Sequence, residues 1–265
     1  MGDCFFHEIS PHFFRLGPAM IGWYVVMFAL AIVFGTLLWQ WQTRRPEYDR
    51  KTMNRVNLAG ALAVVPGARL GHVLAYDFDY YMSQPEEILM IWRGGLASHG
   101  VLAAMMIVFL VASICSSKLS FLDLLDRFVP SATVGAICVR IGNFLNSEIM
   151  GKPTDLPWGV RFMYFDSGTE CRHPVQLYEA LLLAGVLAVV LLIELCWRDR
   201  RPVGLQSGVF GVLYFAGRIP IEILKEPQTT LDVETAFTMG QFLSLAPIVL
   251  GAYFLFRAAR AKRAE

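Results

Sequence analysis

The chain contains seven stretches of about 20 mostly apolar residues, and this recurring length restricts the folds open to it. A helix of that length crosses the hydrocarbon core of a bilayer. Only 17% of the residues are charged, whereas about 25% is usual in soluble domains. We therefore predict an all-α polytopic membrane protein, with about seven transmembrane helices in a single domain over residues 1–265. The expected spans are residues 17–39, 56–75, 95–115, 128–147, 174–195, 207–224 and 240–257.

The basic residues are distributed unevenly between the two sets of segments that flank these spans. Most of the 23 Lys and Arg residues lie on one set, at 44–55, 118–127, 198–201 and 257–263. An excess of basic residues marks the cytoplasmic side, so we predict an external N-terminus and a cytoplasmic C-terminus. Residues 148–173 then form the longest external segment, a candidate lid or partner-binding loop. We expect a short interfacial helix within residues 77–93.

Polar side chains from several spans fall in the outer half of the bilayer in this orientation. They are Tyr24, Arg69, His99, Arg140, Asn143, Gln176, Tyr178, Glu179, Arg218 and Glu222. A charge at membrane depth is costly and usually serves a function. Scattered structural polar residues would not sort by leaflet in this way, so we predict one site that faces the outer leaflet.

The first polar group closes the fourth span. Arg140 and Asn143 are three residues apart and share a helix face, and Asn146 follows at the same interval. A guanidinium suits phosphate oxygens, and an amide can donate to a third oxygen. The alternative is a structural arginine paired with Glu148 or Glu222.

The second polar group lies on the sixth span, where Tyr214, Arg218 and Glu222 recur every four residues on one face. Glu222 is expected to orient Arg218 by a salt bridge and leave the guanidinium to meet an anion. The alternative is a self-satisfied polar stripe that joins two helices.

The remaining polar residues each have a functional and a structural interpretation. His99 follows a glycine-rich segment and could act as a base near neutral pH, although a lone histidine is more often structural. Tyr24 and Tyr178 also suit the aromatic belt of a membrane protein. Arg69 stands between Gly67 and Gly71, a pattern that also favours close helix packing.

The five cysteines show neither CxxC nor another metal-ligand spacing. They are Cys4, Cys115, Cys138, Cys171 and Cys196. We therefore expect neither a disulfide framework nor a zinc site.

Taken together, these segments resemble the bacterial prolipoprotein diacylglyceryl transferases. The main match is Arg140-Ile-Gly-Asn-Phe-Leu-Asn-Ser-Glu148 followed by Gly151, and supporting segments occur in family order along nearly the whole chain. They are Gly67–Gly71 with Tyr76–Tyr80, Gly94–Gly100, His173–Glu179, Tyr214–Glu222 with Lys225–Pro227, and Met239–Gln241. The sequence departs from the family pattern at Val139 and Ser147, where glycine is usual or common, and at His72, where an aromatic residue is often found.

The resemblance implies an enzyme that transfers the sn-1,2-diacylglyceryl group of phosphatidylglycerol to the lipobox cysteine of a prolipoprotein signal peptide. The reaction forms a thioether and releases glycerol phosphate. No metal or cofactor is implied, and the partners are these two substrates and membrane lipid, without nucleic acid. The expected location is the bacterial inner membrane, with the active site on the extracytoplasmic side.

The resemblance also implies roles for individual residues. His99 is the leading candidate for the base, and Arg140 and Arg218 would stabilise charge on the leaving phosphate. Tyr24 and Glu148 complete the expected catalytic set. The expected substrate-binding residues are Arg69, Arg140, Asn143, Asn146, Gly151, Gln176, Tyr178, Tyr214 and Glu222.

Two other function classes compete with this interpretation. Buried arginines also suit a transporter for an anionic lipid or metabolite, but we find no internal repeat, and the polar groups lie in the outer half rather than at the midplane. A non-catalytic lipid-binding or scaffold protein would not need this concentration of His, Arg, Asn, Glu and Tyr.

Overall fold

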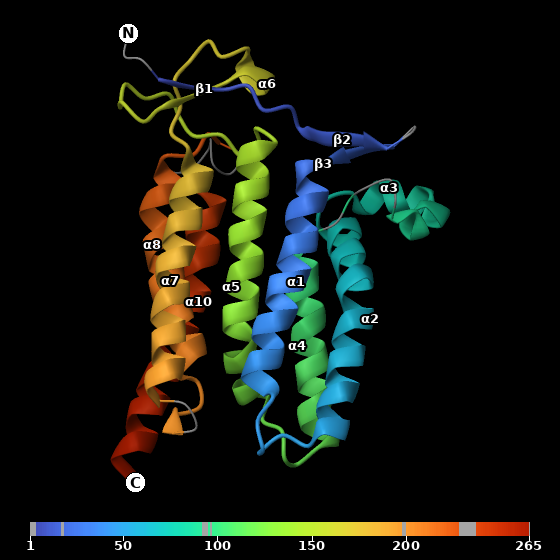
Figure 1. Cartoon of the computed structure of the whole chain (residues 1–265), viewed down its shortest axis with the longest axis vertical. Helices are drawn as coiled ribbons and strands as arrows, with labels where there is room; N and C mark the ends of the chain where they lie inside the picture. Colours follow the sequence, from blue (N-terminus) through green and yellow to red (C-terminus); the bar gives the residue numbers. More distant parts are fainter. Residues whose placement is uncertain are drawn as a thin grey trace. The chain divides into compact units, whose positions relative to one another are not determined.

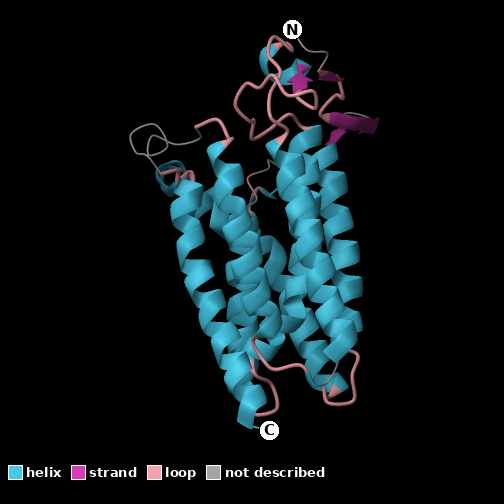
Figure 2. Ribbon diagram, turned by 90° about the vertical axis from the view of Figure 1, so that its left-hand side faces the viewer, coloured by secondary structure: helices cyan, strands magenta, loops and turns pink. Residues whose placement is uncertain are grey.

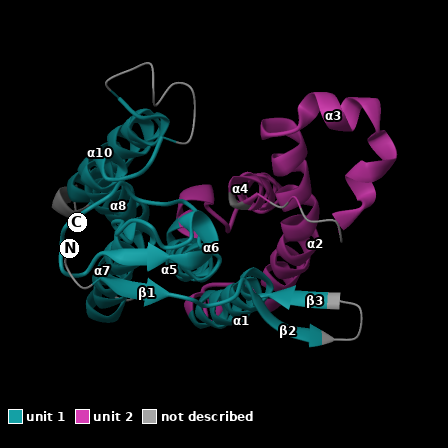
Figure 3. Cartoon of the chain, turned by 90° about the horizontal axis from the view of Figure 1, so that it is seen from above, with its two compact units in different colours: residues 1–41, 126–265 teal, residues 42–125 magenta. Residues whose placement is uncertain are grey.

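A computed structural model describes residues 4–16, 19–91, 95, 97–197, 200–227 and 237–264. These residues form two compact units, which Figure 3 shows in separate colours. The first unit consists of residues 1–41 and 126–265, and the second unit of residues 42–125.

Long helices make up most of the first unit (Figure 1). They are α1 (Trp23–Thr43), α5 (Phe121–Leu145), α7 (Val175–Trp197), α8 (Leu205–Ile223) and α10 (Met239–Ala264), of which α1 and α5 run a few residues past the unit's boundary. Helix α8 packs against both α7 and α10. A core of Val129, Leu183, Val186, Val190 and Tyr214 joins α5, α7 and α8.

Short strands lie at the end of this unit where α1 and α7 begin and α5 ends (Figures 1 and 2). Strand β1 (Phe5–His7) pairs in parallel with β4 (Val160–Phe162), and β2 (His12–Leu16) pairs antiparallel with β3 (Ala19–Gly22). A short helix, α6 (Met163–Asp166), follows β4. The prediction of a purely α-helical chain was therefore wrong at this end, and the first helix begins at Trp23 rather than at residue 17 because residues 19–22 pair as a strand.

A disulfide joins Cys4 to Cys171, whose Cα atoms are 6.2 Å apart. The expectation of no disulfide framework was therefore wrong. Phe5 of β1 pairs with Val160 of β4, and Val160 also bridges to Arg172, so the neighbouring residues Cys4 and Cys171 come together. Their separation of 167 residues carries no local spacing signal, so only the folded chain reveals the partnership.

The second unit consists mainly of helices α2 (Arg50–Ala75) and α4 (Ser98–Cys115), which pack closely. A Cβ atom added to Gly100 would lie 2.2 Å from the carbonyl oxygen of Gly67 and 2.7 Å from the Cα of Gly71. The two backbones therefore meet through glycines, as small residues allow between membrane helices.

The short helix predicted within residues 77–93 is confirmed as two pieces. Helix α3 spans Phe78–Ser83, and the 3₁₀-helix η1 spans Pro85–Leu89. Both follow α2 at the end of the second unit that carries Arg69.

Each of the seven expected spans falls on one of the long helices, and the chain is a polytopic membrane protein. By length and composition, α1, α2, α5, α7 and α10 are long and apolar enough to cross a membrane. Helix α4 is apolar but shorter, and α8 carries Arg218 and Glu222 in its last turns. The number seven and the orientation stay predictions, as does the single domain over residues 1–265.

Candidate active site

The turn after α5 folds back on the end of that helix. The Glu148 backbone N–H donates to the carbonyl oxygen of Asn143 at 2.8 Å. Both side-chain amides then donate to the Glu148 carboxylate, Asn143 Nδ2 at 2.8 Å and Asn146 Nδ2 at 3.2 Å. The expected face of Arg140 and Asn143 is also present, because Arg140 Nη1 lies 3.4 Å from Asn143 Oδ1.

Two residues of this turn have backbone angles in the left-handed region. Ser147 has a φ of 54° and Ile149 a φ of 56°. This region favours glycine and is unusual for a β-branched residue, and it costs on the order of 1–3 kcal/mol per residue. The Gln176 amide holds the turn from α7 by donating to the Glu148 carbonyl oxygen at 2.6 Å.

A cluster of three cations and two carboxylates lies beside this turn. Glu179, on α7, is fully buried and forms ion pairs with Arg140 Nε, with Lys225 Nζ at 2.9 Å and with Arg218 Nε at 3.6 Å. Glu222 forms ion pairs with Arg218 Nε at 3.3 Å and with Lys225 Nζ at 2.8 Å. We call these five residues, Arg140, Glu179, Arg218, Glu222 and Lys225, the charge cluster.

The charge cluster confirms one predicted pairing and corrects another. Arg218 pairs with Glu222 one turn away, as its spacing indicated. Arg140 pairs with Glu179 rather than with Glu148 or Glu222. The packing of α7 against α5 and α8 through a shared core brings Glu179 between the two arginines.

Two glycines allow the backbone to pack closely around the charge cluster. Gly151 forms an antiparallel bridge with Lys225, and a Cβ atom at Gly151 would lie 2.2 Å from the His173 carbonyl oxygen. At the start of α10, a Cβ atom at Gly240 would lie 2.3 Å from the Glu222 carboxylate. Close backbone packing therefore requires a glycine at position 151, and this packing fixes Lys225. The predicted role of Gly151 in substrate binding stays a prediction.

Arg172 holds the segment 148–173 around the site. Its guanidinium forms ion pairs with Asp166 at 2.7 Å, Glu170 at 2.6 Å and Glu226 at 2.6 Å, and it donates to the Gly151 carbonyl oxygen at 3.2 Å. Burial alone would lower the pKa of Arg172, but the hydrogen bonds to Asp166 and Glu226 raise it above its ordinary value. Arg172 is therefore always charged and connects the segment 148–173 to the residues that follow α8.

The three predicted tyrosines occupy different surroundings. Tyr24 lies against α5, where a Cβ atom added to Gly142 would be 3.3 Å from the ring. Tyr214 is buried in the core and stacks on Phe210 at 5.4 Å between ring centroids. The Tyr178 hydroxyl accepts a hydrogen bond from Trp158 Nε1 at 2.8 Å. Tyr24 is therefore next to the helix turn of Arg140, whereas Tyr214 mainly packs.

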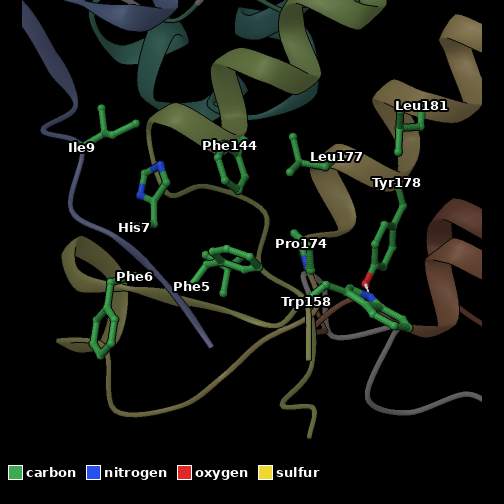
Figure 4. Close-up of a pocket in the computed structure, with 11 residues that line it drawn as sticks. Phe5, Phe6, His7, Ile9, Phe144, Trp158, Pro174, Leu177, Tyr178 and Leu181 are labelled. Atoms are coloured by element: carbon green, nitrogen blue, oxygen red, sulfur yellow. Dashed lines mark hydrogen bonds between the residues drawn. The ribbon is translucent and has the colours of Figure 1, made fainter. Parts of the chain in front are cut away.

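An apolar groove of about 560 Å³ (Figure 4) is lined in part by α5 and α7, the helices that carry Arg140 and Glu179 of the charge cluster. Phe144 follows Asn143 on α5, and Tyr178 precedes Glu179 on α7, so both elements contribute to the groove and to the cluster. Strand β1 closes one side. The lining residues are Phe5, Phe6, His7, Ile9, Phe144, Trp158, Val160, Pro174, Leu177, Tyr178 and Leu181.

Burial lowers the pKa of two histidines beside the short strands, His7 and His173. Burial lowers the pKa of His7, whose ring packs edge-on to Phe144 at 4.7 Å, although a backbone hydrogen bond partly opposes the shift. Burial also lowers the pKa of His173, whose Nδ1 lies 3.3 Å from the Tyr178 hydroxyl. The His7 ring therefore belongs to the wall of the groove, whereas His173 contacts the lining residue Tyr178.

The second unit carries the other two predicted site residues, His99 and Arg69. The His99 ring is exposed at the start of α4, and its Nε2 lies 3.3 Å from the Gly71 carbonyl oxygen. If Nε2 donates there, Nδ1 carries the lone pair of the neutral ring, which is what a base requires.

Arg69 organises the segment after α2. Its guanidinium donates to the carbonyl oxygens of Ile88 at 2.8 Å, Glu87 at 2.5 Å and Gly95 at 3.2 Å. It also lies 4.8 Å from the centre of the Tyr81 ring. These contacts are structural, and its predicted role in substrate binding stays a prediction.

Comparison with known proteins identifies the family. The family model for prolipoprotein diacylglyceryl transferase matches residues 11–257. The chain belongs to this family. A phosphatidylglycerol–prolipoprotein diacylglyceryl transferase of Nitratidesulfovibrio vulgaris is 38% identical over 94% of this chain and 94% of its own length. Proteins of the same name from Nitrosomonas europaea and Chloroherpeton thalassium are 37% and 34% identical, over 96% and 98% of this chain and 91% and 96% of their own lengths.

Family membership confirms the recognition made from the sequence, and with it the class of enzyme, a transferase. The structure places most of the predicted residues of this transferase in one region of the first unit. They are Tyr24, Arg140, Asn143, Asn146, Glu148, Gly151, Gln176, Tyr178, Arg218 and Glu222.

Two members of the charge cluster were missed as site residues, Glu179 and Lys225. Glu179 lies three residues after Gln176 in an otherwise apolar span, so it shares a helix face with a predicted site residue. Lys225 was noted only as part of the segment Lys225–Pro227 that supports the family resemblance. Its bridge to Gly151 is long-range, and no local pattern indicates it.

Proposed function

We propose that this chain transfers the diacylglyceryl group of phosphatidylglycerol to a cysteine thiol of a prolipoprotein, at the charge cluster and the turn of Glu148. The observation that carries the proposal is the half-buried pair Arg140 and Arg218, joined through the buried Glu179. Two guanidinium groups and Lys225 surround two carboxylates, so the cluster has a net positive charge. A phosphodiester supplies one negative charge to such a site.

The proposed reaction is a substitution at the glycerol carbon that carries the phosphate. The thiol loses its proton to a base, because a thiolate is the nucleophile and a free thiol has a pKa of about 8.5. A sulfur–carbon bond forms as the bond from carbon to phosphate oxygen breaks. Glycerol phosphate leaves with a second negative charge, which Arg140 and Arg218 stabilise.

We assign the remaining roles on the chemistry of each residue. His99 takes the thiol proton, because its neutral ring has a free lone pair if Nε2 donates to Gly71. Asn143 and Asn146 hold the Glu148 carboxylate, which then faces the headgroup. Gln176 fixes the backbone of this turn.

We further propose that the apolar groove receives the apolar residues beside the peptide's lipobox cysteine. The groove lies on the same helix ends as the charge cluster, and its lining is almost entirely apolar. Replacing exposed Phe6 by serine should raise the KM for the peptide and leave the KM for the lipid unchanged. Phe13→Ser is the matched control, because Phe13 is also exposed on an outer strand but does not line the groove. Equal effects of the two substitutions would contradict the assignment.

The proposed orientation places the N-terminus, the charge cluster and the groove on the extracytoplasmic side of the inner membrane. The distribution of basic residues supports it, and so does the Cys4–Cys171 disulfide, because disulfides persist on the oxidising side. A membrane-impermeant maleimide should label Asp155→Cys in intact cells. Glu47→Cys should react only after permeabilisation, once Cys115 and Cys196 have been replaced by serine. The reverse pattern would invert the topology.

The activity itself is tested with purified protein, phosphatidylglycerol and a lipobox peptide. Mass spectrometry should detect a diacylglyceryl adduct on the peptide cysteine with the wild type and with Arg260→Ala, which removes an exposed arginine of α10. Folded Arg140→Ala and His99→Ala should form little or none. Full activity of both variants would refute the site, and a folded wild type that forms no adduct would refute the function.

A further inference from the structure

Glu179 is the member of the charge cluster that all three cations share. Its side chain is 1% exposed and contacts Arg140, Arg218 and Lys225. Glu222 contacts only the last two. A buried carboxylate with three cationic partners ties α5, α7 and the end of α8 together at one point.

Both arginines meet Glu179 through the same atom. Arg140 and Arg218 each approach Glu179 with Nε. The single Nε–H of Arg218 donates to Glu222 at 3.3 Å, so Glu179 attracts this guanidinium by charge at 3.6 Å. The terminal amino groups lie at the opposite end of each guanidinium plane. Arg140 Nη1 makes only a long contact of 3.4 Å with Asn143. A guanidinium held at Nε presents its terminal pair of N–H groups as a fork in a fixed direction, and this fork matches phosphate oxygens.

We propose that Glu179 is a positioning residue for the transfer reaction: it holds the Nε atoms of Arg140 and Arg218 so that their terminal amino groups face the leaving phosphate. This inference rests on the proposed function. Glu179 does not touch the substrate, and it acts through the two arginines.

The charges of the cluster set the direction of the expected effect. Three cations and two carboxylates leave one positive charge, which matches one phosphodiester. Glu179→Gln would raise this to two, so the binding of an anionic lipid should be unchanged or tighter. The two arginines would lose their common anchor, and a shift of about 1 Å in a positioning group can cost about a hundredfold in rate. We therefore expect kcat to fall by about a hundredfold while the KM for phosphatidylglycerol does not rise.

Glu194 provides a matched control on the same helix. It is 1% exposed and also pairs with two arginines, Arg127 at 3.2 Å and Arg201 at 3.3 Å. Fifteen residues separate it from Glu179, which places it roughly 22 Å away along the helix. Glu194→Gln therefore removes the same kind of buried ion pair without touching the charge cluster.

The experiment compares wild type, Glu179→Gln, Glu179→Asp and Glu194→Gln as purified full-length proteins. Transfer kinetics are measured with phosphatidylglycerol and a lipobox peptide and divided by the folded fraction from size exclusion. We expect Glu179→Gln to lose kcat without a rise in KM, and Glu194→Gln to keep both constants. Glu179→Asp keeps the charge on a shorter side chain, so it should show a smaller loss of kcat and remain folded if the glutamine variant does not.

Two outcomes would overturn the inference. One is a Glu179→Gln or Glu179→Asp enzyme with wild-type constants. The other is a loss of kcat that Glu194→Gln shows equally. Binding of glycerol 3-phosphate, measured by the change in tryptophan fluorescence, separates this inference from the proposed function. If the wild type transfers nothing, the proposed function fails. If the wild type transfers but Glu179→Gln binds glycerol 3-phosphate more weakly, the inference about Glu179 fails, because its loss should leave this binding unchanged or tighter.

Discussion

The glycine contact between α2 and α4 gives a quantitative prediction for Gly100→Ala. The added Cβ would lie 2.2 Å from the carbonyl oxygen of Gly67 and 2.7 Å from the Cα of Gly71. Both are backbone atoms, so no side chain can move aside. Ordinary contact begins at 3.4 Å, so the helices must separate by about 1 Å, and a gap of that size forfeits a quarter to a half of each dispersion contact along the seam.

Two opposing effects determine the size of the change. Overpacking of this kind typically costs 1–3 kcal/mol, and here it falls on rigid backbone. Alanine gains up to about 1 kcal/mol over glycine in helix propensity. We expect Gly100→Ala to lower the free energy of unfolding by about 2 kcal/mol. Transfer activity should fall as well, because a displaced α4 moves His99 away from the Gly71 carbonyl oxygen, now 3.3 Å from its Nε2.

Gly185→Ala is the matched control. Gly185 also lies inside a long helix, but a Cβ atom there meets nothing within 4 Å. This variant should therefore be neutral or up to about 1 kcal/mol more stable. Reversible unfolding in mixed micelles with increasing dodecyl sulfate, followed by circular dichroism, measures both. A Gly100→Ala protein as stable as Gly185→Ala would refute the close packing.

Three further predictions concern the outer end of the first unit. Replacing Cys4 and Cys171 by serine should expose β1 to proteolysis while the helices stay intact, as limited digestion with mass spectrometry would show. The prediction is contradicted if β1 is as well protected in the variant and in the reduced wild type as it is in the oxidised wild type. Because burial lowers the pKa of His7 below its ordinary 6.5, the stability it contributes is complete above pH 6.5 and is lost as the pH falls toward the lowered value. The protection of β1 amides against hydrogen exchange, relative to their intrinsic exchange rates, should therefore fall below pH 6.5 in the wild type but not in His7→Phe. Ile149→Gly should relieve backbone strain and raise the free energy of unfolding by about 1 kcal/mol, yet lower activity by loosening Glu148; a loss of stability would show that the turn is unstrained.

Much of the architecture could be predicted because membrane helices obey local rules. A span of about 20 apolar residues must satisfy its own backbone hydrogen bonds, so it forms a helix whatever its neighbours are. The same local logic indicated the face shared by Arg140 and Asn143 and the pairing of Arg218 with Glu222, since each depends only on helical spacing.

The long-range contacts could not be predicted in this way. Cys4 with Cys171 and Gly151 with Lys225 depend on how loops fold over one another. The strand at 19–22 replaced the expected start of the first span, because pairing with residues 12–16 satisfies its backbone outside the helices. A pairing partner in another segment leaves no periodic signal.

Sequence alone determined the class of protein, its family and the identity of most of the candidate site residues, because composition, helical spacing and the motif around Arg140 are all local properties. Only the tertiary structure decided which charges meet. Arg140 had three carboxylates within plausible reach, and the packing of α7 between α5 and α8 selected Glu179. A buried ion pair depends on geometry at the level of single ångströms, and that geometry exists only after the helices have packed.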